Sequence, residues 1–326
     1  MRILIIGGTR FVGRHITEAA IAAGHEVSLL HRGQTGPELF PEAEHLRADR
    51  NADLSVLRER RWDTTIDVSA YHPGQIASLA GALSTGQYVF VSSTAVYTVP
   101  KEPGFAEDSP LVELDGPIPE AVTIETYGAL KVLCERAAVE HFGSETLIVR
   151  PTYVIGPYDY TGRFTYWVNR IARGGEVLAP GDPTDPIQVI DGRDMAAWII
   201  AMAEKAGSGA FHAVSPPPPF SFGDMLEAIV AEVGPPGTTL TWVGQDFLRS
   251  EGEDGRSLPL WSEGGGHAAV NTADPAAAAA AGLSPRPFGR SVREIRESEA
   301  SFSTDTTISP DREADLLARW RSRPQG

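Results

Sequence analysis

The sequence is poor in cysteine and has no long hydrophobic run. Among its 326 residues Cys134 is the single cysteine, which excludes an internal disulfide and fits a reducing cytoplasm. No apolar run reaches the roughly 18 residues that a membrane-spanning helix needs, so we expect no membrane segment. A strand pattern begins at residue 2, and we therefore expect no signal peptide.

Positive charge is also scarce. The formal net charge is −15, and only three lysines occur. Nucleic-acid binding needs a basic surface stripe, whereas the one basic cluster here is Arg58, Arg60 and Arg61. We therefore expect no nucleic-acid partner and attribute the acidity to solubility. The histidines show no H-x-x-x-H or similar pairing, so the sequence predicts no metal site.

The N-terminus carries the strand–turn–helix pattern of a dinucleotide pyrophosphate site. Residues 3–13, ILIIGGTRFVG, combine an apolar run, a glycine turn and a helix start. Gly7 and Gly8 allow the turn, Gly13 allows the helix to pack closely, and the first helical amides face the phosphates. A second strand at βαβ distance favours this interpretation over a tight turn without a ligand.

Short apolar runs alternate with helical patterns in the first half of the chain. Strands are expected near 2–6, 26–30, 64–68, 87–92 and 146–149, and helices near 11–23, 53–59, 73–83 and 125–142. This alternation predicts an α/β fold of Rossmann type, a doubly wound parallel sheet. We assign residues 1–155 to an NAD(P)-binding domain and 156–326 to a smaller C-terminal α+β substrate lobe. Elements at about 187–215 are expected to return to the main sheet.

Tyr127 and Lys131 form a second candidate site. Their spacing places both side chains on one face of a helix. A nearby ammonium stabilises a phenolate, so Lys131 is expected to lower the pKa of Tyr127 and make it a proton donor and acceptor. Residues 90–97, FVSSTAVY, end a strand in hydroxyl groups that can bind a substrate oxygen beside the tyrosine.

These motifs, in this order, resemble the extended and atypical short-chain dehydrogenases/reductases, and more closely the NAD-dependent epimerase/dehydratase family. The resemblance covers residues 1 to about 200 and includes RPTYVIGP at 150–157. It implies that Ser93 orients the substrate oxygen and that Tyr127 is the general acid/base. It also implies that Lys131 binds the nicotinamide ribose.

The resemblance further implies a set of ligand-binding residues. The expected cofactor-binding residues are Gly7, Thr9, Arg10, Phe11, Val12, Gly13, His31, Arg32, Asp49, Arg50, Val68, Ser69, Ala70, Tyr127, Lys131, Pro151 and Tyr153. The expected substrate contacts are Thr94, Tyr153, Arg163 and Tyr166.

Two departures from the family pattern concern the choice of cofactor. Arg10 replaces the middle glycine, and the second strand ends in His31 and Arg32 without the acidic residue that binds a ribose 2′-hydroxyl. Arg10 and Arg32 together can clamp a 2′-phosphate, which favours NADP(H) over NAD(H). In the alternative, either arginine stacks on adenine or pairs with Asp49.

The expected reaction is hydride transfer at a secondary alcohol or ketone carbon of a small molecule. Thr94-Ala95 stands where the family's sugar dehydratases carry Asp-Glu, so dehydration by that route is not expected.

A nucleotide-sugar epimerase with tightly bound NAD remains an alternative, because it uses the same three residues. The turn GGTRF also resembles that of stem-loop RNA-binding proteins, so a non-catalytic dinucleotide- or RNA-associated protein is a third possible function. Relatives suggest that the protein forms a homodimer through the helices near 73–83 and 125–141.

Overall fold

A seven-stranded parallel sheet forms the centre of the computed structural model, which describes residues 1–100, 102–216, 220–262, 269–298 and 306–323. The strand order is β10-β6-β5-β4-β1-β2-β3. The strands are β1 (Arg2–Ile6), β2 (Glu26–His31), β3 (Glu44–Arg47), β4 (Trp62–Asp67), β5 (Thr85–Val91), β6 (Leu147–Pro151) and β10 (Gly209–Ala213). The strand order reverses between β1 and β4, and ligands bind at the carboxyl ends of strands at such a reversal.

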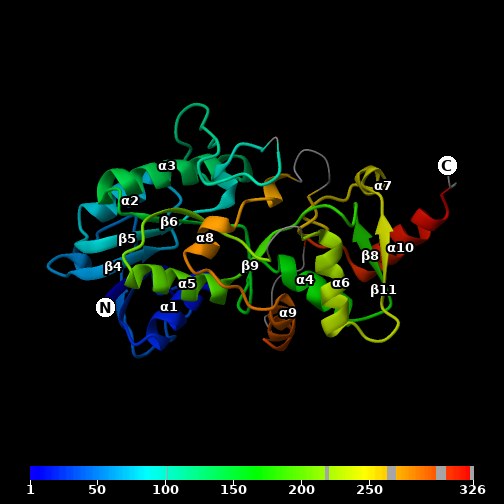
Figure 1. The fold of residues 1–326 in the computed structure, drawn as a ribbon, viewed down its shortest axis with the longest axis horizontal. Coiled ribbons are helices and arrows are strands. Elements are labelled where there is room, and N and C mark those ends of the chain that lie inside the picture. Colours follow the sequence, from blue (N-terminus) through cyan, green and yellow to red (C-terminus); the bar gives the residue numbers. More distant parts are fainter. Residues whose placement is uncertain (101, 217–219, 263–268, 299–305, 324–326) are drawn as a thin grey trace.

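Helices cover both faces of this sheet (Figure 1). On one face lie α1 (Phe11–Ala22) and α5 (Gly192–Glu204), and on the other lie α2 (Pro73–Ala80) and α3 (Ile124–Phe142). Successive side chains of a strand point to opposite faces of the sheet. Val89 therefore packs in the core with α1 and α5, and Phe90 packs in the core with α2 and α3. The predicted doubly wound Rossmann sheet is therefore confirmed.

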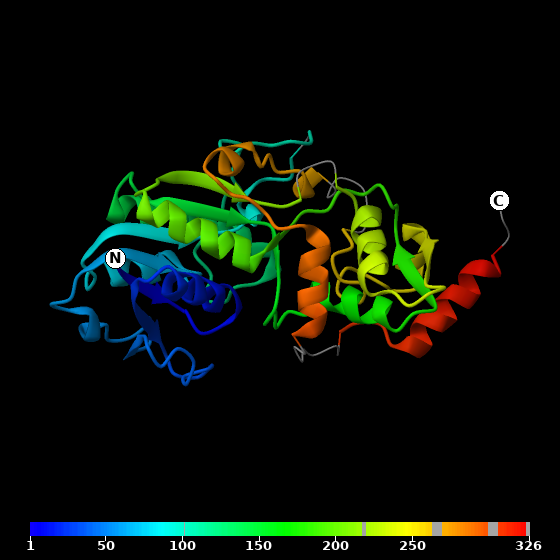
Figure 2. The ribbon, with the colours of Figure 1, turned by 60° about the horizontal axis from the view of Figure 1, so that its bottom comes forward.

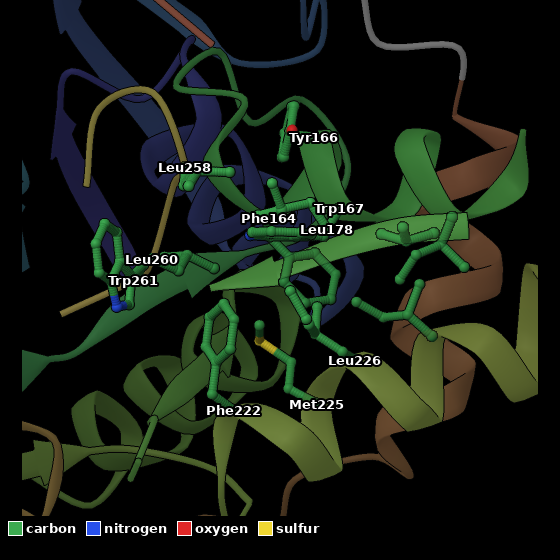
Figure 3. Packing of buried hydrophobic residues seen from close by; sticks show 14 of the residues in the cluster. Phe164, Tyr166, Trp167, Leu178, Phe222, Met225, Leu226, Leu258, Leu260 and Trp261 are labelled. Carbon is green, nitrogen blue, oxygen red and sulfur yellow. The ribbon is translucent and has the colours of Figure 1, made fainter. Parts of the chain in front are cut away.

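A smaller lobe lies beside the sheet, and Figure 2 shows it from a second side. Its core gathers large aromatic and aliphatic side chains, including Trp167, Leu226 and Trp261 (Figure 3). Its elements are α4 (Arg163–Ala172), β8 (Glu176–Pro180), α6 (Phe222–Val233), β11 (Thr239–Val243), α7 (Gln245–Ser250), α9 (Phe288–Glu297) and α10 (Pro310–Arg321). A short helix, α8 (Ala276–Ala280), packs near β10.

The two strands within residues 187–215 belong to different sheets. Strand β10 pairs in parallel with β6 and so extends the central sheet. Strand β9 (Val189–Asp191) pairs instead with β7 (Tyr153–Ile155) in a separate two-stranded sheet. Both connections bring the chain back across the boundary between sheet and lobe.

The prediction of a helix at residues 53–59 is wrong. Only a short 3₁₀ turn, η1 (Ser55–Leu57), forms there. The Asp53 carboxylate accepts hydrogen bonds from the amide and the hydroxyl of Ser55, at 2.9 and 2.6 Å, and this local pattern competes with a helical turn. The polar edge strand β3 and the lobe elements β11, α7 and α9 were not predicted. No helix within the described residues is long and apolar enough to span a membrane.

Candidate active site

A groove of about 430 Å³ passes the carboxyl ends of β1, β2 and β4. At its centre Gly7 adopts a φ of +85°, and a Cβ on Gly13 would overlap the carbonyl oxygen of Gly7. Both positions therefore require glycine. The start of α1 has no side-chain cap and no acidic residue in its first turn, so its amides suit an anionic group. These features fit the pyrophosphate of a dinucleotide.

One end of the groove is lined by residues that follow β2 and β3. Arg32 is exposed there, and no acidic residue ends β2. The carboxylate of Asp49 accepts hydrogen bonds from the backbone and side-chain nitrogens of Asn51, at 2.9 and 3.1 Å. Arg50 also lines the groove, but its guanidinium is directed to the buried carboxylate of Asp67 at 2.8 and 2.7 Å.

The start of α1 is linked to the loop that follows β7. The Cζ of Arg10 lies 3.4 Å from the ring centroid of Tyr160, and that of Arg14 lies 3.4 Å from the ring of Tyr158. The predicted clamp of Arg10 with Arg32 is thus not formed, because the Arg10 guanidinium stacks on a tyrosine. His15, which the sequence analysis did not select, adds a hydrogen bond of 2.9 Å to the Pro157 carbonyl.

Ser93, Tyr127 and Lys131 come together beyond this groove. Ser93 ends the segment after β5 and accepts a hydrogen bond from the Ala95 amide at 3.1 Å. Its hydroxyl lies close enough to the phenol of Tyr127, in the first turn of α3, to act on the pKa of that phenol. Lys131, one turn later, is buried and donates hydrogen bonds to the carbonyls of Ala70 and Val91, at 3.0 and 2.9 Å.

The predicted lowering of the Tyr127 pKa by Lys131 is wrong. Burial raises the pKa of Tyr127 to about 12, and the phenol of Tyr71 acts in the same direction. Ser93 and Arg163 act in the opposite direction but do not prevail. Lys131 is not among the main causes of this shift: its ammonium is directed to two backbone carbonyls, and burial lowers its own pKa to about 8.

Tyr71 joins the groove to these three residues. It lines the groove, its ring centroid lies 6.3 Å from that of Tyr127, and Lys131 Nζ lies 5.0 Å from its ring. The side-chain oxygen of Gln75 fixes the backbone here, because it accepts a hydrogen bond from the Tyr71 amide at 2.9 Å. Tyr71 was not among the predicted site residues, although its place after Val68, Ser69 and Ala70 at the end of β4 was a usable signal.

The expected substrate contacts have different surroundings. Thr94 donates to the carbonyl of Pro151 at 3.4 Å, and the guanidinium of Arg163 lies 5.0 Å from the ring of Tyr153. Tyr166 is 6% exposed and packs in the lobe core against Trp167 (Figure 3). The predicted role of Tyr166 in substrate contact is therefore wrong, since core packing encloses its ring. No group of three potential metal ligands occurs within the described part of the chain.

The chain is similar in sequence and in fold to proteins of one family. The sequence model of the NAD dependent epimerase/dehydratase family matches residues 3–87 and 58–213. The chain is 25% identical over 230 residues to the chloroplast stem-loop binding protein of 41 kDa b of Arabidopsis thaliana, covering 65% of this chain and 58%, less than two thirds, of that protein. It is 25% identical over 242 residues to the isoflavone reductase homolog IRL of Zea mays, covering 74% of this chain and 70% of that one.

The fold is similar to that of a solved epimerase. A crystal structure of UDP-glucuronic acid 4-epimerase from Bacillus cereus in complex with NAD superposes with a TM-score of 0.65 at 17% identity, covering 92% of this chain and 98% of that chain. The family match spans most of the sheet and includes the glycine turn and the Ser93, Tyr127 and Lys131 cluster. The chain therefore belongs to the NAD-dependent epimerase/dehydratase family.

Proposed function

We propose that this protein is an NAD(P)-dependent oxidoreductase that transfers a hydride at a secondary alcohol or ketone carbon of a small molecule. The observation that carries the proposal is the cluster of Ser93, Tyr127 and Lys131, joined by Tyr71 to a groove that fits a dinucleotide. The similarity to a reductase homolog over 74% of the chain supports the same reaction class.

Each residue has a distinct task in this proposal. Bound nicotinamide supplies the hydride or accepts it. In reduction, Tyr127 Oη donates a proton to the carbonyl oxygen as the carbon is reduced, and water then returns a proton to the phenolate. Ser93 orients that oxygen by hydrogen bonding, and Lys131 would donate a hydrogen bond to the nicotinamide ribose.

The raised pKa of Tyr127 determines which form of the phenol is present. Since burial raises the pKa of Tyr127 to about 12, its phenol is protonated at neutral pH and can act as the acid in reduction. Oxidation uses the phenolate as the base, and that form is scarce at neutral pH. The rate of alcohol oxidation should therefore increase as pH rises.

NADP(H) is the favoured cofactor in this proposal. Arg32 is exposed at the end of β2, where it lines the groove, and the neighbouring His31 carries no negative charge to repel a 2′-phosphate. Because Arg10 stacks on Tyr160, this preference depends on Arg32 alone. An Arg32→Ala variant should therefore lose affinity for NADPH and keep its affinity for NADH.

The test begins with the dinucleotide. The purified protein is first denatured so that any released cofactor can be identified. Calorimetric titration with NADPH and with NADH then gives the affinity for each. Finally, ketones are screened as substrates by following the oxidation of NADPH. Tyr127→Phe should lower kcat at least about 100-fold with an unchanged dissociation constant for NADPH. Tyr166→Phe is the matched control, since this tyrosine lies in the lobe core, and it should retain the wild-type kcat.

Three results would overturn the proposal. Undiminished activity of Tyr127→Phe would show that Tyr127 is not the general acid/base. Tightly retained, stoichiometric NAD without net cofactor turnover would establish the epimerase alternative. Absence of any dinucleotide binding, with stem-loop RNA bound instead, would establish the non-catalytic alternative.

A further inference from the structure

Two histidines face each other on neighbouring strands at one end of the groove. His31 ends β2 and His45 lies in β3, with His31 Nε2 2.8 Å from His45 Nδ1. The two rings are perpendicular, with centroids 5.0 Å apart, and His31 is only 8% exposed. Neither residue belongs to the Ser93, Tyr127 and Lys131 cluster, so their pairing requires a separate explanation.

The hydrogen bonds around this pair determine where the protons lie. The Gly33 amide donates to His31 Nδ1 at 3.0 Å, so Nδ1 is an acceptor and Nε2 carries the proton. His31 Nε2 then donates to His45 Nδ1, and His45 Nε2 donates to the carbonyl of Phe40 at 3.1 Å. Every polar atom of both rings is satisfied, provided that both rings are neutral.

This chain of bonds fixes part of the groove wall. Gly33 adopts a φ of +75°, and the segment from Arg32 to Thr35 lines the groove beside it. The bond from the Gly33 amide to His31 closes this turn on the strand end. The bond from His31 to His45 connects the same turn to β3, which ends two residues before Asp49, another residue that lines the groove.

Protonation of either ring would break the chain of bonds. A proton on His31 Nδ1 removes the acceptor for the Gly33 amide, and a proton on His45 Nδ1 removes the acceptor for His31. The groups that act on His31 are His45 and Arg47 of β3, and Arg32 follows it in the chain. Burial, together with His45 and Arg47, lowers the pKa of His31 below its usual range, so His31 is neutral at neutral pH.

We propose that His31 is a positioning residue whose neutral pairing with His45 holds the Arg32–Thr35 wall of the groove, so that acid weakens dinucleotide binding. This inference rests on the proposed function, because it concerns the affinity of the same groove. Below the His31 pKa, binding requires the release of one proton. The dissociation constant for the dinucleotide should then rise by up to about tenfold for each unit by which the pH falls.

The probe is NADH, measured by calorimetry from about pH 8 to about pH 5, across the range in which histidine titrates. NADH lacks the 2′-phosphate, which a protonated His31 would attract and which would mask the effect. Hydrogen–deuterium exchange of the peptide that contains Gly33, corrected for the intrinsic pH dependence of exchange, provides a second measurement that needs no ligand.

The decisive variant is His31→Asn. Its side-chain oxygen can still accept the Gly33 amide, but the residue does not titrate and no longer reaches His45. We expect wild-type affinity and Gly33 protection to fall together at a pH below 6.5, and both transitions to disappear in His31→Asn. His141→Asn, an exposed site in the last turn of α3, is the matched control and should keep both transitions.

Two results overturn the inference. If NADH affinity and Gly33 protection do not change with pH, or change identically in His31→Asn, the histidine pair does not position the wall, and the proposed function is unaffected. If neither NADH nor NADPH binds even at about pH 8, the proposed function fails together with the predicted link to affinity. The exchange measurement distinguishes these cases, since it reports the turn without a ligand.

Discussion

The guanidinium of Arg50, which lines the groove, and the carboxylate of Asp67 form a buried, two-pronged ion pair at the end of β4. Both nitrogen–oxygen distances are below 3 Å, and the phenol of Tyr88 donates a further bond to the same carboxylate at 2.7 Å. Each residue is less than one tenth exposed. The pair joins the segment after β3 to β4 and thereby fixes the wall that contains Asp49.

Breaking this pair should be costly. Asp67→Asn leaves the guanidinium of Arg50 buried without a counter-charge, which typically costs about 3–5 kcal/mol of unfolding free energy. Urea unfolding at neutral pH measures the loss. Glu26→Gln is the matched control, because Glu26 pairs with Arg2 at an exposed site and its loss should cost at most about 0.5 kcal/mol. Equal effects of the two variants would contradict the assigned role.

The stack of Arg10 on Tyr160 should couple α1 to the loop after β7. A double-mutant cycle with Arg10→Gly and Tyr160→Leu is expected to give a coupling free energy of about 0.5–1 kcal/mol, which is typical of an exposed cation–π pair. Unfolding free energies of the four proteins provide the measurement. Arg10→Gly combined with Tyr158→Leu is the control and should show weaker coupling, because Tyr158 stacks on Arg14. Strict additivity for Arg10 and Tyr160 would show that the stack contributes no stability.

Gly128 should control the distance between Tyr127 and Ser93. A Cβ at Gly128 would overlap the carbonyl oxygen of Ala95, so Gly128→Ala must push α3 away from the segment that contains Ser93. We expect a lower kcat and a loss of roughly 1–3 kcal/mol in stability, as for other overpacked sites. Gly74→Ala, in α2, has open space around the added methyl and should be neutral or slightly stabilising. Full activity of Gly128→Ala would separate helix packing from catalysis.

Lys131 should make stability depend on pH in alkaline solution. Its pKa falls from 10.5 in the unfolded chain to about 8 in the folded protein, so above pH 8 the unfolded state binds the additional proton. The wild-type free energy of unfolding therefore gains a contribution as pH rises through 8, and this contribution is absent from Lys131→Met. The variant should also lose activity.

The measurement is the difference in unfolding free energy between Lys131→Met and the wild type. This difference should become less favourable to the variant as pH increases from about 8 to about 9, and the contributions of Cys134 and the buried tyrosines, which both proteins share, largely cancel in it. A pH-independent difference would mean that Lys131 titrates normally.

Local chemistry made several features predictable from the sequence. The turn at Gly7, the close approach at Gly13 and the helical face shared by Tyr127 and Lys131 all depend on residues a few positions apart. Strand–helix alternation likewise predicted the Rossmann sheet, because a parallel sheet must bury both faces under helices. The short strand β3 was missed because its four residues, EHLR, have neither an apolar run nor a clear alternation.

The sequence alone determined the family, the backbone turn at the phosphates and the spacing of the acid/base pair, since each is written in neighbouring residues. Only the tertiary structure decided the environment of each side chain. It placed Arg10 on Tyr160 and Tyr166 in the lobe core, and it left the pKa of Tyr127 raised despite Lys131. Burial and charge at a site depend on groups that are distant in the sequence, and those groups meet only when the chain folds.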